Sequence, residues 1–237
     1  MNSDLCFGFS VQNWTSLSPR LRQGDEDAWG IAVGVFERRM TERYFSCIEA
    51  LERADTKPDV AKADAAQGGG APDSKSTEER HECIPGFAIV ALCCLLIESI
   101  QEFREEPAQV QIPQERCTFP EGRCVHPGSG TTDRFKAFLR HPAFNGAFNE
   151  DLAKEFCRGI RNGIMHQAET RGWVIWRDEP EGKILAPEDD GYSLNRTLFR
   201  QAVRDVFDEY IRSLRNPKSS ELRERFKERM NRLCGKA

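Results

Sequence analysis

The sequence predicts a mainly α-helical protein, a bundle of four to five helices with one small inserted β-hairpin. Apolar residues recur at three- and four-residue steps in several long segments, which is typical of helices with one buried face. A further segment, 87–97, is apolar throughout. With 39% hydrophobic and 30% charged residues, the 237-residue chain can bury a sizeable core, so we expect one domain over 1–237.

The first helix is expected over 26–53, where the apolar residues share one face. That face consists of Trp29, Val33, Phe36, Met40, Tyr44, Ile48 and Leu51. The next stretch, 55–80, has almost no large apolar side chains, but it has three consecutive glycines and two prolines. Burial in such a stretch cannot offset the entropy lost on ordering, so we expect a flexible linker.

The second helix is expected over 86–104, and it is apolar nearly all round, as in the central helix of a bundle. Its apolar run is shorter than the about 20 residues of a membrane span, so we expect no membrane association. Glu98 is the first charge to interrupt the run. It either marks where the helix reaches solvent or provides an acidic group that faces a site.

Prolines and glycines make 105–130 irregular in the prediction. Cys117, Cys124 and His126 lie there, but their spacing is not that of a zinc site, so we expect no metal and no cofactor. The nine cysteines form no regular framework, and the first residues lack the features of a secretion signal. We therefore expect reduced thiols and a cytoplasmic location.

The second half of the chain continues the helical pattern. The elements expected are helices over 132–140, 149–170, 195–215 and 218–233, and a hairpin of 172–176 with 182–185. The chain has a net charge of -4, yet residues 195–237 hold twelve Lys and Arg against six Asp and Glu. The basic C-terminal helix, 218–233, could hold a polyanion, or its charges could be an ordinary solvated face.

The segment most suggestive of chemistry lies in the 149–170 helix and reads FCRGIRNGIMHQAET over 156–170. Asn162 and His166 are four residues apart and should share a helix face. Arg161 lies one position round the helix, but its side chain is long enough to reach the same pocket. Gly159 and Gly163 should leave a smooth face that a second helix can approach closely, which would offset their cost inside a helix.

This segment resembles the signature of the HEPN superfamily, an arginine followed by a polar residue and, a few residues later, a histidine. Arg161, Asn162 and His166 match these three positions, with four residues between the arginine and the histidine. The surrounding run is also similar to a bacterial subgroup whose motif reads approximately IRCGLLHQAET, where a cysteine stands at the position of Asn162. The specific part of the resemblance covers only about fifteen residues.

The resemblance implies a metal-independent RNA endonuclease that acts as a homodimer, with two Arg–His sets around one cleft. His166 would transfer protons, since imidazoles titrate near neutral pH. Arg161 would bind the phosphate and stabilise charge in the transition state. Asn162 would orient His166 or bind a phosphate oxygen, and Arg158 and Gln167 would contact RNA. Members act in toxin–antitoxin and phage-defence systems, so an antitoxin or regulatory protein is a further expected partner.

Three other interpretations stay open at this point. The chain could be a non-catalytic HEPN module that binds nucleotide or RNA. It could be a helical scaffold whose basic C-terminal helix binds a protein. Arg161 and His166 could also be ordinary residues at a helix end, where cations interact favourably with the helix dipole.

Overall fold

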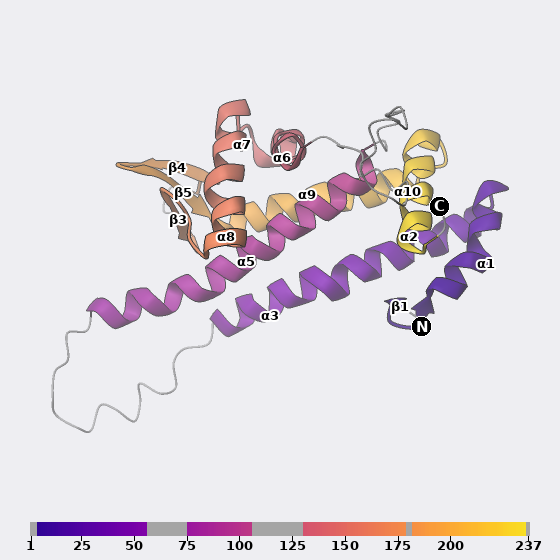
Figure 1. The fold of residues 1–237 in the computed structure, drawn as a ribbon, viewed down its shortest axis with the longest axis horizontal. Coiled ribbons are helices and arrows are strands. Elements are labelled where there is room, and N and C mark those ends of the chain that lie inside the picture. Colours follow the sequence, from indigo (N-terminus) through magenta and orange to yellow (C-terminus); the bar gives the residue numbers. More distant parts are fainter. Residues whose placement is uncertain (1–3, 56–74, 106–129, 179–181, 236–237) are drawn as a thin grey trace, which may run out of the picture.

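The central element of the fold is the long helix α5 (Lys75–Arg104), around which helices from both ends of the chain pack (Figure 1). The computed structural model describes residues 4–55, 75–105, 130–178 and 182–235, with only the backbone over 75–84. The buried side chains of these residues form one contiguous hydrophobic core. The predicted mainly α class is confirmed.

The first predicted helix is a nearly continuous rod of three segments, α2 (Glu26–Met40), the π-helical turn η1 (Thr41–Phe45) and α3 (Ser46–Asp55). Asp25 caps its start by accepting a hydrogen bond from the backbone N–H of Ala28 at 3.0 Å. The predicted apolar face is confirmed. Trp29, Val33, Phe36, Met40 and Ile48 are buried, and Tyr44 and Leu51 pack partly buried against the core.

The predicted linker over 55–80 is wrong at both ends. Asp55 is the last residue of α3, and α5 begins at Lys75, well before the predicted start at residue 86. The stretch 75–80 is rich in Lys, Glu and Arg, which are good helix formers and extend the helix without large apolar side chains. The rest of the predicted linker lies outside the described residues, as does most of the irregular region predicted over 105–130.

By length and hydropathy alone, the part of α5 over Pro85–Arg104 could cross a membrane, with a mean hydropathy of 1.8. Core helices of soluble proteins pass the same test. In this fold its apolar side chains have protein neighbours. Those fully or nearly fully buried are Ile89, Val90, Cys93, Cys94, Leu96, Ile97, Ile100 and Phe103. Residues beyond Glu98 are still buried, so the helix does not reach solvent at that point. The interpretation of Glu98 as the place where the helix emerges is therefore wrong.

The N-terminal elements were not predicted. They are a two-stranded antiparallel ribbon, β1 (Asp4–Cys6) with β2 (Phe9–Ser10), and the helix α1 (Val11–Arg22). A capping box between Ser10 and Asn13 starts α1. Trp14 is fully buried, packs edge-on to Phe226 and donates its indole N–H to Asn231 at 2.8 Å, which joins the two ends of the chain.

The remaining predicted helices are present. They are α6 (Thr131–Leu139), the continuous segments α7 (Glu150–Phe156), η4 (Cys157–Arg161) and α8 (Asn162–Gln167), then α9 (Arg196–Arg215) and α10 (Ser220–Leu233), with a 3₁₀ turn η3 (Pro142–Phe144) after α6. The third main helix therefore ends at residue 167, three residues earlier than predicted.

The predicted pairing of the hairpin strands is wrong. β3 (Trp173–Trp176) pairs in parallel with β5 (Gly191–Asn195), and β4 (Leu185–Glu188) pairs with the other edge of β5 in antiparallel orientation. The strand order is β3-β5-β4, so the hairpin is formed by β4 and β5. The reason is that β5 buries Ser193, Leu194 and Asn195 and takes the central position, which separates the two strands expected to be neighbours.

Candidate active site

The candidate site lies on the helix formed by α7, η4 and α8. Its start is capped as predicted, because Asn149 Oδ1 accepts a hydrogen bond from the N–H of Leu152 at 2.8 Å. Phe156, Ile160 and Ile164 are buried on its core side, which confirms most of the predicted stripe, and Leu152 is partly buried. The helix stands across the middle part of α5, next to the three-stranded sheet (Figure 1).

Arg161 is the last residue of a π-helical turn, η4, in the middle of this helix. In the turn, the N–H of Asn162 bonds the carbonyl of Cys157, one residue further back than in an α-helix. Single π turns within α-helices occur frequently at functional sites. The turn changes the rotational phase between the buried first half of the helix and the Arg161–His166 segment, so the two halves can face different neighbours.

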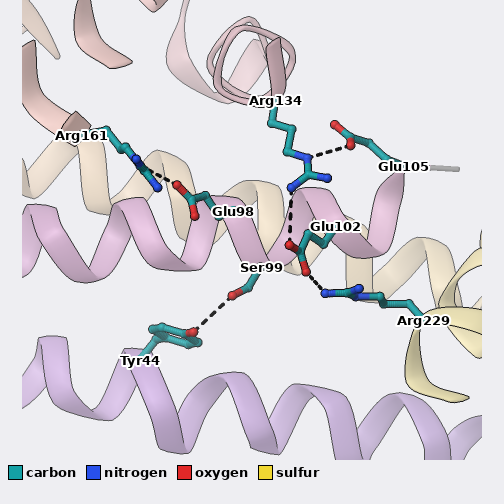
Figure 2. Close-up of polar contacts among 8 residues, drawn as sticks. All are labelled: Tyr44, Glu98, Ser99, Glu102, Glu105, Arg134, Arg161 and Arg229. Carbon is teal, nitrogen blue, oxygen red and sulfur yellow. Dashed lines mark hydrogen bonds and ion pairs between the residues drawn. The ribbon is translucent and has the colours of Figure 1, made fainter. Parts of the chain in front are cut away.

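The guanidinium of Arg161 is fixed by two hydrogen bonds. Its Nε donates to Glu98 Oε1 of α5 at 2.7 Å (Figure 2). Its Nη1 donates to Asn162 Oδ1 at 3.0 Å. Both partners of the ion pair are partly buried, with side-chain exposures of 18% for Arg161 and 25% for Glu98. Within the described part of the chain Nη2 has no hydrogen-bond partner, so one edge of the guanidinium can still bind an anion.

Two buried thiols lie in the electrostatic environment of this ion pair. Burial raises the pKa of the Cys94 thiol well above its ordinary value, and Arg161 opposes that rise. Burial likewise raises the pKa of Cys157, whose Sγ lies 3.7 Å from Thr132 Oγ1. Both thiols therefore remain protonated and neutral, and they add no negative charge to the surroundings of the ion pair.

His166 lies in the last turn of α8, where its side chain is exposed. Among the described residues it has no hydrogen-bond or ion-pair partner, so Arg161 and Asn162 are brought together but His166 is not joined to them. Arg158 is exposed as well and has no partner in the same part of the structure. Gln167 accepts a hydrogen bond from Arg171 Nε at 2.7 Å.

The expectation that Gly159 and Gly163 open a face for a second helix is wrong. A Cβ at Gly159 would lie 2.6 Å from Nε1 of Trp173, and one at Gly163 would lie 2.3 Å from the carbonyl oxygen of Glu169. The chain's own segment after α8 therefore occupies this face. It turns back through Ala168, which has a left-handed φ of 55°, and the N–H of Glu169 bonds the carbonyl of Gly163 at 3.3 Å.

The charge of the basic C-terminal helix is largely neutralised within the protein. Arg223 forms a two-pronged ion pair with Glu26, with distances of 2.7 and 2.9 Å, and Lys227 contacts Glu224 at 2.6 Å. Arg229 pairs with Glu102 of α5 (Figure 2). These ion pairs reduce the charge that the helix presents, and the two interpretations, a polyanion site and a solvated face, stay predictions.

Glu98 was recognised in the sequence as an unusual charge, but its partner was not. The two residues are 63 positions apart, and nothing in the local sequence links them. In the part of the chain that the structure describes, no three His, Cys, Asp or Glu residues gather as metal ligands. Cys117, Cys124 and His126 lie outside the described residues.

Comparison with known proteins leaves the family open. The chain matches no protein-family model, no curated protein and no solved structure. The geometry around Arg161 is therefore the basis on which a function can be proposed.

Proposed function

We propose that the chain is a HEPN-like RNA endonuclease that acts as a homodimer and needs no metal. The observation that carries the proposal is the state of Arg161, which Glu98 and Asn162 orient while its Nη2 edge has no partner in the described structure. A fixed guanidinium with one unused edge suits a phosphate oxygen. His166, exposed five residues further along, supplies a group able to transfer protons.

In the proposed reaction the ribose 2′-hydroxyl attacks the adjacent phosphorus. The new 2′-O–P bond forms as the bond to the leaving 5′-oxygen breaks, which gives a 2′,3′-cyclic phosphate and a 5′-hydroxyl end. His166 accepts the 2′-hydroxyl proton or donates a proton to the leaving oxygen. Arg161 stabilises the charge that develops on the phosphate, and Asn162 keeps the guanidinium in place. DNA lacks the 2′-hydroxyl and should not be cut.

The position of His166 favours a dimeric site. It lies at the exposed end of α8 beside Met165, which is 40% exposed, and no neighbour in the described structure orients its ring. A second copy would provide both a neighbour for the ring and a second Arg161. A role in toxin–antitoxin or phage defence, with an antitoxin or regulatory partner, follows from the sequence resemblance and belongs to the same proposal.

The second candidate is a HEPN-like module that binds nucleotide or RNA without cutting it. The observation in its favour is that the Glu98 carboxylate already balances the charge of Arg161, while no contact in the described structure positions His166 for proton transfer. Such a site could hold a phosphate through Arg161 Nη2 and yet lack an organised acid or base.

A cleavage assay separates the two. Mixed RNA and matched DNA are incubated with the wild-type chain, His166→Ala and Arg161→Ala, in EDTA, and Lys154→Ala serves as control because Lys154 is an exposed cation on the same helix, away from the motif. We expect cutting of RNA alone, at least about 100-fold slower in His166→Ala and unchanged in Lys154→Ala. Tight RNA binding without cutting would favour the binding module, and equal cutting by all variants would contradict both.

A further inference from the structure

A second group of arginines surrounds a small cavity where α2, η1, α5 and α10 meet. The cavity has a volume of about 80 Å³, and the charged residues lining it are Arg39, Arg43, Arg229 and Glu102. Three guanidinium groups thus face one carboxylate, which leaves an excess of positive charge. This cavity does not include Arg161 or His166 and is separate from the candidate active site.

The protein does not neutralise these arginines fully. Among the described residues, Arg39 donates only to a backbone carbonyl, that of Leu5, at 2.7 Å. Arg43 is exposed and has no partner among the described residues. Arg229 pairs with Glu102, but its Nε is buried without a hydrogen-bond partner. A buried donor without a partner is costly, so an acceptor is missing from this site.

Burial and neighbouring positive charges both oppose the charged form of two of these arginines. Burial lowers the pKa of Arg39, and the neighbouring charge of Arg43 lowers it further. Burial lowers the pKa of Arg229 too, with a further contribution from Arg232. A bound anion would oppose both effects, because it supplies negative charge beside partly buried guanidinium groups.

Two hydroxyl groups add a neutral donor. Tyr44 Oη and Ser99 Oγ both line the cavity and lie 3.2 Å apart (Figure 2). Whichever of them donates in this hydrogen bond, the other keeps a free O–H hydrogen that can point to a ligand. Arg43 and Tyr44 belong to η1, which is a π turn like η4. This cavity therefore also coincides with a feature that is frequent at functional sites.

We propose that this cavity is a binding site for a phosphate group. A phosphate dianion matches the excess of two cations, and guanidinium and hydroxyl donors suit its oxygens. The volume suits one small tetrahedral oxyanion and is too small for a nucleoside. The ligand is therefore free phosphate, or the phosphate of a monoester whose remainder lies outside the cavity beside the exposed Arg43.

Calorimetric titration of the full chain tests the site, with inorganic phosphate and AMP as the two ligands at an ionic strength fixed with sodium chloride. We expect one phosphate per chain, with a Kd weakened at least fivefold in Arg43→Ala. Arg43 is exposed, so this variant should fold. Arg212→Ala is the matched control, because Arg212 is an exposed helical arginine outside the cavity, and its Kd should equal that of the wild type.

A variant with the opposite expected effect makes the test sharper. Glu102→Gln removes the one carboxylate among the described residues that line the cavity, and it should tighten phosphate binding, provided that circular dichroism shows an intact fold. Binding of AMP as tight as that of phosphate identifies a monoester as the source, and binding of phosphate alone identifies the free ion. No binding of either ligand, or equal losses in Arg43→Ala and Arg212→Ala, would overturn the proposal.

Discussion

Arg161 and Glu98, 63 residues apart in the sequence, form a partly buried ion pair of 2.7 Å that joins the candidate catalytic helix to α5. It is one of a row of such contacts along this side of α5. Glu102 and Glu105 follow one and two turns later, and both bond Arg134 of α6, at 3.4 and 3.0 Å (Figure 2). The carboxylates of α5 thus hold several surrounding helices in place.

Replacing Glu98 with Ala should lower the free energy of unfolding by about 1–3 kcal/mol, because it leaves the partly buried Arg161 without its charged partner. Under the proposed function, cleavage by folded Glu98→Ala should also fall at least tenfold, since the guanidinium loses its orientation. Urea unfolding and a cleavage assay measure the two effects.

Glu49→Ala is the control for this change, because Glu49 is an exposed carboxylate on α3 with no partner in the described residues. It should alter neither stability nor activity. Unchanged unfolding of Glu98→Ala would show that the ion pair contributes nothing measurable, as is common for exposed pairs.

Alanine at Gly163 should destabilise the protein by about 1–3 kcal/mol, although alanine normally favours a helix. The new Cβ would lie 2.3 Å from the backbone oxygen of Glu169, and a backbone atom cannot move aside as a flexible side chain can. Thermal or urea unfolding measures the loss. Gly30→Ala is the matched control, since nothing lies within 4 Å of its Cβ in α2, and it should raise stability by up to about 1 kcal/mol.

Glycine at position 168 should stabilise the protein by about 0.5–1 kcal/mol. Ala168 ends α8 with a φ of 55°, a left-handed conformation that glycine adopts without the steric cost of a Cβ. The comparison is Ala50→Gly, an exposed position inside α3, where the same change should cost about 1 kcal/mol. A loss of stability in both variants would contradict this account of the helix end.

Stability should fall as the pH rises above about 9. Burial raises the pKa of Cys93 from 9.0 to about 12, and burial also raises the pKa values of Cys94 and Tyr210. The unfolded chain releases these thiol protons near pH 9 whereas the folded chain keeps them, so protonation stabilises the fold fully below pH 9 and this contribution is lost between pH 9 and 12. Each fully titrating group contributes about 1.4 kcal/mol per pH unit.

Urea unfolding between pH 8 and 11 measures this slope. Cys93→Ala removes one of the titrating groups. The loss of unfolding free energy per pH unit should therefore be smaller by the contribution of that group, whatever the effect of the substitution on stability at pH 8. Ala50→Gly, a change at an exposed residue that has no titrating group, should leave the slope unchanged. Equal slopes in the wild type and Cys93→Ala would contradict the assignment.

Local patterns in the sequence correctly predicted the structural features that depend on residues close together in the chain. The spacing from Trp29 to Ile48 predicted a buried helix face, and Asn149 predicted a helix start, because caps and helix faces involve residues three or four apart. The same spacing led us to group Asn162 with His166, whereas the side chain of Asn162 accepts a hydrogen bond from Arg161.

The remaining features depend on residues far apart in the chain. The parallel pairing of β3 with β5 is set by the packing of both strands on the core, and the pattern within either strand does not specify it. The partner of Glu98 is likewise fixed by how two helices pack. The N-terminal helix α1 was a missed local signal, since Trp14, Leu17 and Leu21 follow the helical spacing and only Pro19 interrupts it.

The π turn η4 also bears on how the length of this chain could vary. A π turn contains one residue more than the α-helical turn it replaces. A homologous chain that lacks one residue of Cys157–Arg161 could therefore still form an unbroken helix, although its first half would be turned by about 100° relative to the segment of His166. In a sequence alignment, a single-residue gap just before the arginine would then indicate that the side chains of the motif point in a different direction relative to the core. The helix that carries the motif would still be present.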